Sequence, residues 1–109
     1  MDIRKLHLSD LDMLEMLEEA CQPYPWSREN LAEELSRSQE ESFSLLGVNS
    51  ENMGVSYVIA REVVGELWIL QVGTDPDYRR QGYSKQILLQ VFEEASKQGV
   101  KQAVLEVRV

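Results

Sequence analysis

The stretch "TDPDYRRQGYSKQILLQVFEEASKQG", residues 74–99, joins a polar turn to a long amphipathic pattern. From Gly82 onward, apolar residues recur three and four positions apart, which predicts a helix. Gly99, directly after the last turn, is typical of a helix C-terminus. Two apolar segments that predict strands, 66–74 and 101–109, flank this helix. Because strand, helix and strand follow one another with short joints, we expect a βαβ unit with two parallel strands.

The N-terminal part of the chain contains the other predicted elements. Residues 2–6 alternate in polarity and predict a short first strand. Two helices follow, for which Ser9 and Ser27 are the expected N-cap residues. Segments 42–48 and 53–64 predict two strands that pair as an antiparallel hairpin. The predicted fold class is therefore α/β with a mixed sheet, in the element order β-α-α-β-β-β-α-β.

The composition of residues 1–109 predicts one folded domain with an acidic surface. Hydrophobic residues make up 43% and charged residues 28%, and the formal net charge is −8. This charge argues against nucleic acid as a partner. It suits a basic substrate, although an acidic surface that only keeps the protein soluble explains it as well. No apolar run approaches the roughly 20 residues of a membrane span, so we expect no membrane partner. Cys21 has no second cysteine to pair with and no signal peptide is visible, which predicts a cytoplasmic protein.

Residues 79–85 form a candidate ligand-binding segment, because they lie where a strand gives way to a helix. The first N–H groups of a helix have no partner within it, and the helix dipole places partial positive charge there. Gly82 permits close approach of a ligand, and the segment also carries Arg79, Arg80 and Lys85. This combination predicts a phosphate or pyrophosphate site. An equally good interpretation is that the arginines are only solvated and that Gly82 only relaxes the bend of the turn. Neither a P-loop nor a Gly-x-Gly-x-x-Gly fingerprint is present.

The string "RRQGYS", residues 79–84, resembles the Arg/Gln-x-x-Gly-x-Gly/Ala acetyl-CoA motif of the GNAT superfamily of N-acetyltransferases. Ser84 departs from the usual Gly or Ala at the end of that motif. The strings "VGTDPDYRRQG", "LEVRV" and "YPWS" are similar to the bacterial ribosomal-protein alanine N-acetyltransferases within this superfamily. The resemblance covers essentially the whole chain. It implies the GNAT acyl-CoA N-acyltransferase fold, acetyl-CoA as co-substrate and no metal ion.

The resemblance also implies where acetyl-CoA lies. Its pantetheine arm would pair with the strand at Val72, Gly73 and Thr74. A backbone N–H of that strand would stabilise the oxyanion of the tetrahedral intermediate. The pyrophosphate would rest on the backbone amides of the following loop, which are those of Arg80, Gln81, Gly82, Tyr83, Ser84 and Lys85. The Ser84 hydroxyl would either crowd this approach or donate to a phosphate oxygen.

Glu106, in the string "LEVR", matches the proposed general base of the family. An amine must lose a proton before it attacks a thioester, and partial desolvation raises the pKa of a carboxylate toward that task. From the residues alone, a solvated glutamate or one paired with Arg108 is an equally good interpretation. The implied acceptor is an amine, most specifically the N-terminal α-amine of a protein such as a ribosomal protein. Tyr24 and Trp26 would line its channel or only anchor their loop, and Trp68 is expected in the core.

One departure from the family concerns the C-terminal end. The family continues past "LEVR" with a helix whose Tyr is the usual general acid. We therefore expect residues 1–109 to be a C-terminally incomplete N-acetyltransferase domain that binds its substrates more weakly. The last strand would then be an exposed sheet edge through which copies self-associate. The alternative is a catalytically weak or inactive fragment that binds CoA or serves as an interaction module.

Overall fold

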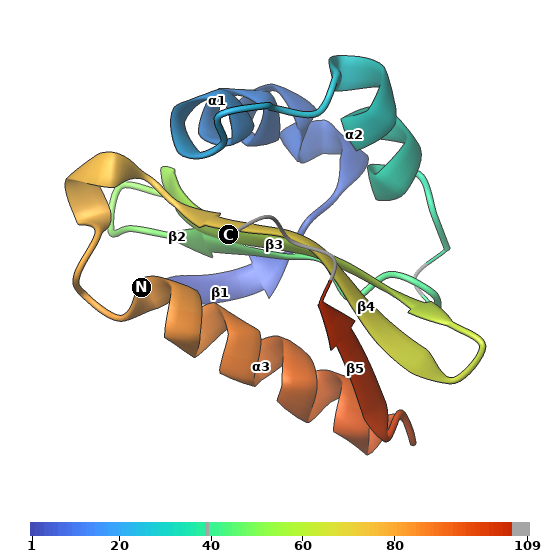
Figure 1. The fold of residues 1–109 in the computed structure, drawn as a ribbon. Coiled ribbons are helices and arrows are strands. Elements are labelled where there is room, and N and C mark those ends of the chain that lie inside the picture. Colours follow the sequence, from blue (N-terminus) through green and yellow to red (C-terminus); the bar gives the residue numbers. More distant parts are fainter. Residues whose placement is uncertain (39, 106–109) are drawn as a thin grey trace.

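A mixed β-sheet forms the centre of the computed structural model, which describes residues 1–38 and 40–105. Its described strands lie side by side in chain order (Figure 1). These strands are β1 (Asp2–Lys5), β2 (Leu45–Val48), β3 (Gly54–Val63), β4 (Glu66–Thr74) and β5 (Gln102–Leu105). Neighbouring strands from β1 to β4 are antiparallel, whereas β4 and β5 are parallel. The mixed sheet, the antiparallel hairpin and the parallel pair around the long helix are all confirmed.

Helices cover both faces of this sheet. Helices α1 (Leu11–Cys21) and α2 (Arg28–Leu35) lie on one face, and α3 (Tyr83–Lys97) lies on the other (Figure 1). Ser27 caps α2 as predicted, because its hydroxyl accepts a hydrogen bond from the Asn30 N–H at 3.2 Å. The structure therefore has three layers with an apolar core on each side of the sheet.

Strand β4 contributes to both cores because its side chains alternate between the two faces. Leu67 and Ile69 are fully buried in the cluster that contains the apolar stripe of α3. Leu70 belongs to the cluster under α1 and α2 but is only half-buried. Burying a Leu or Ile completely stabilises the fold by about 1.5–3 kcal/mol, so the α3 side anchors the strand more firmly. The face of β4 toward α1 and α2 is left partly open.

An extra residue in β4 alters its register with β3. Ile59 pairs with Gln71 and Ala60 pairs with Ile69, which leaves Leu70 as a bulged residue. Bulges redirect the side chains that follow them and are frequent beside functional sites. Here the bulge places the Gln71 side chain under α1, where its amide donates to Glu18 at 2.7 Å. The bulge therefore determines which groups of β4 face the open side of the sheet.

The predicted N-cap of the first helix is wrong. A short 3-10 turn, Leu8–Asp10, precedes α1, and Asp10 rather than Ser9 is the residue before its first turn. The Asp10 carboxylate accepts two hydrogen bonds from Arg4 and one from the His7 N–H, each at 2.9 Å. The Arg4 guanidinium holds the pKa of this carboxyl below its usual range. A local capping box between His7 and Asp10, supported by the Arg4 ion pair, thus begins this helical segment before the predicted cap. Within the described residues, no helix combines the length and apolar character needed to cross a membrane.

Candidate functional site

The turn between β4 and α3 has an unusual backbone. Arg80 and Gly82 both adopt left-handed conformations, with φ of 66° and 76°. Gly82 is the N-cap residue of α3 and, as a glycine, has no side chain with which to cap this end of the helix. Turns that visit the left-handed region gather successive N–H groups into an anion-binding concavity, and the dipole of a helix reinforces it. The predicted phosphate-binding segment thus contains two residues with the left-handed conformation that is typical of such concavities.

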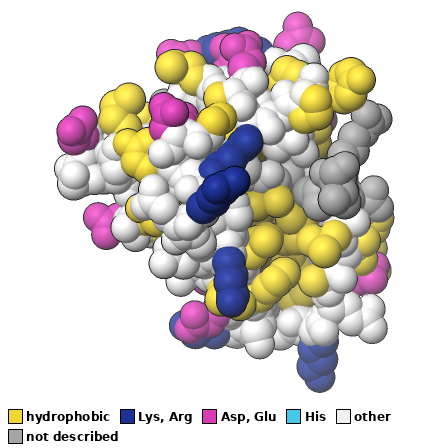
Figure 2. Space-filling model, turned by 60° about the vertical axis from the view of Figure 1, so that its left-hand side comes forward, with side chains coloured by type: hydrophobic (Ala, Val, Ile, Leu, Met, Phe, Trp, Pro, Cys, Tyr) yellow, Lys and Arg dark blue, Asp and Glu magenta, His cyan; other side chains and the backbone are white. Residues whose placement is uncertain are grey.

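Cationic side chains surround this turn. The turn and the end of β4 enclose a hollow of about 200 Å³, lined by Thr74, Tyr78, Arg79, Arg80, Gly82, Tyr83, Ser84 and Lys85. Arg79 Nε donates to the Thr74 carbonyl oxygen at 3.2 Å, which holds this guanidinium against the strand end. Figure 2 shows Lys and Arg side chains near the middle of a face whose Asp and Glu side chains lie mostly toward the margin. We call this hollow the loop hollow.

Three hydroxyl groups connect the loop hollow to the sheet. Thr74 Oγ1 lies 3.0 Å from Ser56 Oγ and 2.6 Å from Ser84 Oγ. Ser56 also donates to the Gly73 carbonyl oxygen at 3.0 Å. The first turn of α3 is thereby joined to both β4 and β3. The Ser84 hydroxyl, which the sequence left open as a steric obstacle or a phosphate donor, is engaged with Thr74.

A second hollow, of about 400 Å³, runs along the end of β4. It is lined by Cys21, Gln22, Pro23, Val72, Gly73, Thr74, Arg79 and Ser84. The described pairing of β4 with β5 ends at Ile69 and Leu105, so no described strand occupies the outer edge of β4 next to this hollow. A free strand edge offers backbone N–H and C=O groups to an extended ligand. We call this hollow the strand-edge hollow.

Cys21 lies in the strand-edge hollow as a thiol. Burial raises its pKa to about 11, and the nearby Arg79 only partly opposes this effect. A thiol with so high a pKa forms little thiolate near neutral pH and is a poor nucleophile. The raised pKa therefore argues against Cys21 as a nucleophile near neutral pH.

A third hollow, of about 440 Å³, is rich in aromatic side chains. It lies between the α1–α2 loop and the open face of β3 and β4, and we call it the aromatic hollow. Its lining residues are Gln22, Pro23, Tyr24, Trp26, Arg61, Trp68, Leu70 and Gln71. Trp68 lines this hollow and is half-buried, so its predicted place in the core is wrong. The bulge at Leu70 and the incomplete cover by α1 and α2 explain why this face stays open.

The three hollows are joined in series. The loop hollow and the strand-edge hollow share Thr74, Arg79 and Ser84. The strand-edge hollow and the aromatic hollow share Gln22 and Pro23. Neighbouring hollows thus share wall residues, in an order that runs from the cationic turn, past the part of the β4 edge that no described strand occupies, to the aromatic hollow.

A buried hydrogen-bond network supports the junction between the last two hollows. The Glu18 carboxylate is fully buried and accepts hydrogen bonds from the Tyr57 hydroxyl, from Gln71 Nε2 at 2.7 Å and from the Trp26 N–H at 2.8 Å. Gln22 Nε2 donates to Tyr57 Oη at 3.0 Å and to the Val72 carbonyl oxygen at 3.1 Å. The network fixes the α1–α2 loop onto the sheet and satisfies a charge that would be costly to bury alone.

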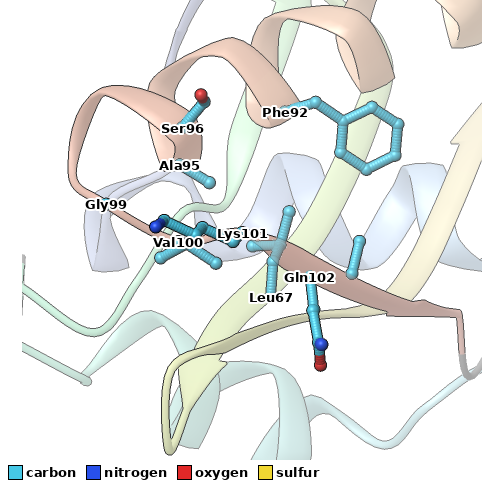
Figure 3. A pocket seen from close by; sticks show the side chains of 9 residues that line it. Leu67, Phe92, Ala95, Ser96, Gly99, Val100, Lys101 and Gln102 are labelled. Carbon is cyan, nitrogen blue, oxygen red and sulfur yellow. The ribbon is translucent and has the colours of Figure 1, made fainter.

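A further hollow, of about 480 Å³, lies on the other side of the sheet, between α3 and β5 (Figure 3). Phe92, Ala95 and Ser96 line it from the helix, Leu67 from β4 and Gln102 from β5. It shares no lining residue with the three connected hollows. Among the described residues that line it, Lys101 alone is ionisable, so these residues do not provide the paired groups expected of an acid–base site.

The structure gathers most of the predicted site residues along the connected hollows. Those that line them are Val72, Gly73, Thr74, Arg80, Gly82, Tyr83, Ser84 and Lys85. Gln81 belongs to the same turn, but its exposed side chain lines neither the loop hollow nor the strand-edge hollow. Glu106 lies outside the described residues. Sequence reasoning missed Gln22 and Pro23, because nothing in the local pattern places the end of α1 beside β4.

Comparisons with known proteins show which family and fold this chain resembles. Residues 11–109 match the model of the acetyltransferase (GNAT) family. The [ribosomal protein bS18]-alanine N-acetyltransferase of Escherichia coli strain K12 is 28% identical over 106 residues, which are 97% of this chain and 69% of that protein. The crystal structure of the ribosomal-protein-S18-alanine N-acetyltransferase from Escherichia coli superposes with a TM-score of 0.88 and 26% identity, over 99% of this chain and 67% of that one.

A second structure shows the same fold with a ligand named. The PaiA N-acetyltransferase of Thermoplasma acidophilum, solved in complex with coenzyme A, has a TM-score of 0.83 and 20% identity. The match covers 95% of this chain and 77% of that one. The chain thus spans about two thirds to three quarters of the length of these three relatives.

Proposed function

The chain belongs to the acetyltransferase (GNAT) family, and from this premise we propose that it transfers the acetyl group of acetyl-CoA to the N-terminal α-amine of a protein. The observation that carries this proposal is the series of three connected hollows. The order of these hollows suits acetyl-CoA. The cationic turn suits a diphosphate, the β4 edge suits an extended arm with amide groups, and the aromatic hollow lies where the thioester would meet a second substrate.

The loop hollow suits the diphosphate of acetyl-CoA. In this proposal the backbone N–H groups from Arg80 to Lys85 bind the phosphate oxygens, assisted by the α3 dipole. The pantetheine arm then follows the edge of β4 at Val72, Gly73 and Thr74, as an added strand would. A backbone N–H of this edge stabilises the oxyanion that forms from the thioester carbonyl.

The proposed reaction is a direct transfer. The amine nitrogen attacks the acetyl carbonyl carbon, the C–N bond forms, and the C–S bond breaks. The sulfur leaves as a thiolate with the bonding electron pair, and the nitrogen loses one proton to a base. We propose Glu106 as that base, acting directly or through a water molecule. A free thiol has a pKa near 8.5, so the thiolate can leave without a strong acid beside it.

The aromatic hollow supports a peptide as acceptor. Tyr24, Trp26 and Trp68 offer flat apolar surfaces, while Gln71 and Arg61 supply polar groups among them. Such a chamber suits the first residues of a polypeptide better than a small polyamine, which would need carboxylates in its lining. A ribosomal protein is the acceptor class we favour, because the 28% identical relative from Escherichia coli is named for one.

The proposal is tested by following CoA release from acetyl-CoA with a thiol-detecting reagent. The acceptor is a lysine-free peptide with an N-terminal alanine, and the matched control is the same peptide with its N-terminus already acetylated. We expect release with the first peptide alone. The Glu106→Gln variant should lose at least about a hundredfold in kcat while its Kd for CoA stays unchanged.

Three outcomes would contradict parts of this proposal. Transfer to lysine side chains but not to N-terminal amines would overturn the acceptor class. CoA binding without transfer to any amine would favour the alternative of a catalytically weak fragment. Full activity of Glu106→Gln would remove this residue from the mechanism.

A further inference from the structure

Gln22 lies where the two proposed substrates would meet. It is the C-cap residue of α1, and it lines both the strand-edge hollow and the aromatic hollow. In the proposed function the thioester occupies the first of these hollows and the acceptor enters through the second. Groups of Gln22 that remain open to solvent are therefore placed beside the reacting atoms.

The hydrogen bonds around Gln22 fix the orientation of its amide. The Tyr57 hydroxyl has one proton and donates it to the Glu18 carboxylate. Burial above all, and then this bond, raise the pKa of the Tyr57 hydroxyl well above its ordinary value, so the proton stays in place. Tyr57 Oη can then only accept from Gln22, and the Val72 carbonyl oxygen can also only accept. Both hydrogens of the Gln22 amide nitrogen are therefore committed to the protein.

The amide oxygen of Gln22 has no such commitment. It accepts no hydrogen bond from any residue that the structure describes, and it is not among the buried unpartnered side-chain atoms found there. Among the described residues the oxygen is therefore neither paired nor buried without a partner, and the nitrogen beside it sets its orientation. We propose that Gln22 Oε1 accepts a hydrogen bond from the α-amine of the acceptor and so positions this amine for attack on the thioester. This inference rests on the proposed function.

The chemistry of the attack favours such an acceptor. As the nitrogen forms its bond to the acetyl carbon it becomes positively charged, and its N–H groups become stronger donors. The hydrogen bond to Gln22 Oε1 then gains strength between the ground state and the transition state, as a catalytic interaction must. Gln22 itself gains and loses no proton. The proton that leaves the nitrogen passes to the base.

Tyr57 and Glu18 are positioning residues in this arrangement. They do not touch the substrate, but they determine which end of the Gln22 amide faces the hollows. Glu18 is held in turn by the Trp26 N–H and Gln71 Nε2, so the same buried carboxylate connects the amide to the wall of the aromatic hollow. Acceptor binding and amine orientation are therefore coupled through one network.

The test compares the binding of two peptides to the unaltered protein and to three variants. One peptide is the lysine-free peptide with an N-terminal alanine, and the other carries a propionyl group in place of the alanyl residue and so lacks only the amine. Their Kd values are measured in the presence of saturating CoA for the unaltered protein, Gln22→Met and Gln98→Met. Gln98 is an exposed residue at the far end of α3 and serves as the matched control. Gln22→Ala is a second variant in case Met disturbs folding.

We expect the unaltered protein and Gln98→Met to bind the alanyl peptide about tenfold more tightly than the propionyl peptide. A tenfold ratio of Kd values corresponds to the contribution of one charge-assisted hydrogen bond. In Gln22→Met and Gln22→Ala the ratio of the two Kd values should fall to about one. Their kcat/KM should be about tenfold lower than that of the unaltered protein, and their Kd for CoA should agree with its value within about twofold.

An unchanged ratio in a folded Gln22 variant overturns the inference. A large loss of CoA affinity also overturns it, because Gln22 would then act on the arm of CoA through Val72. If the unaltered protein acetylates no N-terminal amine, the proposed function fails first, before any variant is measured.

Discussion

Thr74 Oγ1 lies 2.6 Å from Ser84 Oγ, and this contact joins the end of β4 to the first turn of α3. The two residues belong to the strand edge and to the phosphate-binding turn that the proposed function assigns to acetyl-CoA. The bond therefore sets the relative position of the two parts of one ligand site. It also explains how a serine is tolerated at a position where the family motif has Gly or Ala.

We predict that Ser84→Ala lowers the free energy of unfolding by about 1 kcal/mol, because Thr74 loses a largely buried hydrogen-bond partner. The Kd for CoA should change less than about threefold, since the hydroxyl bonds to the protein rather than to phosphate. Urea denaturation and calorimetric titration measure the two quantities. A tenfold weaker Kd with unchanged stability would show instead that the hydroxyl contacts the phosphates.

Gly82 is predicted to matter through its backbone conformation. A Cβ added there would meet no atom within 4 Å, but φ is 76°, where an L residue is strained. We expect Gly82→Ala to cost about 1 kcal/mol of stability and to weaken CoA binding at least about tenfold, because the turn rearranges.

Gly65 provides the matched control for this prediction. It has φ of 80° and equally open surroundings, but it lies in the turn between β3 and β4, at the opposite end of β4. Gly65→Ala should cost a similar amount of stability and leave the Kd for CoA unchanged. Equal CoA binding by both variants would count against the assignment of the turn to the diphosphate.

The parts of the fold that the sequence predicted correctly have strong local patterns. Helix α3 and strand β4 carry long apolar periodicities, and the turn between them has Gly82 at the position that needs a left-handed backbone. The cap of α1 was predicted wrongly because a 3-10 turn with a His7–Asp10 capping box precedes the helix, and Asp10 also accepts from Arg4, which the pattern around Ser9 does not indicate. Local chemistry thus determines the βαβ unit and most of the loop hollow.

The rest of the site depends on contacts between distant parts of the chain. Gln22 meets residues 35 and 50 positions away, and Glu18 meets Gln71 across 53 positions. The bulge that places Gln71 under α1 arises from the pairing of two strands and leaves no mark in either one alone. The acceptor side of the site, including the open face at Trp68, could therefore be found only in three dimensions.

Gly73 is predicted to be required for close packing behind the strand edge. A Cβ added there would lie 2.8 Å from Cys21 Cβ and 2.9 Å from Tyr57 Cε1, and neither atom is the flexible end of a side chain. We expect Gly73→Ala to destabilise the protein by about 1–3 kcal/mol, as overpacking of a core does. It should also weaken CoA binding, because β4 must shift. A variant with unaltered urea midpoint and CoA affinity would contradict this packing.

Cys21 is predicted to react slowly with iodoacetamide at neutral pH and to gain reactivity up to about pH 11, because burial raises its pKa from 9.0 to about 11.

The same raised pKa affects stability, because the folded protein holds the thiol proton more tightly than the unfolded chain does. Between pH 9 and 11 the unfolded chain loses this proton first, so stability falls with rising pH in that range. Cys21→Ala, which has no such proton, should lack this part of the decline while retaining acetyl transfer. Half-maximal alkylation at or below pH 9, or loss of transfer in Cys21→Ala, would mean that the thiol is exposed or takes part in the reaction.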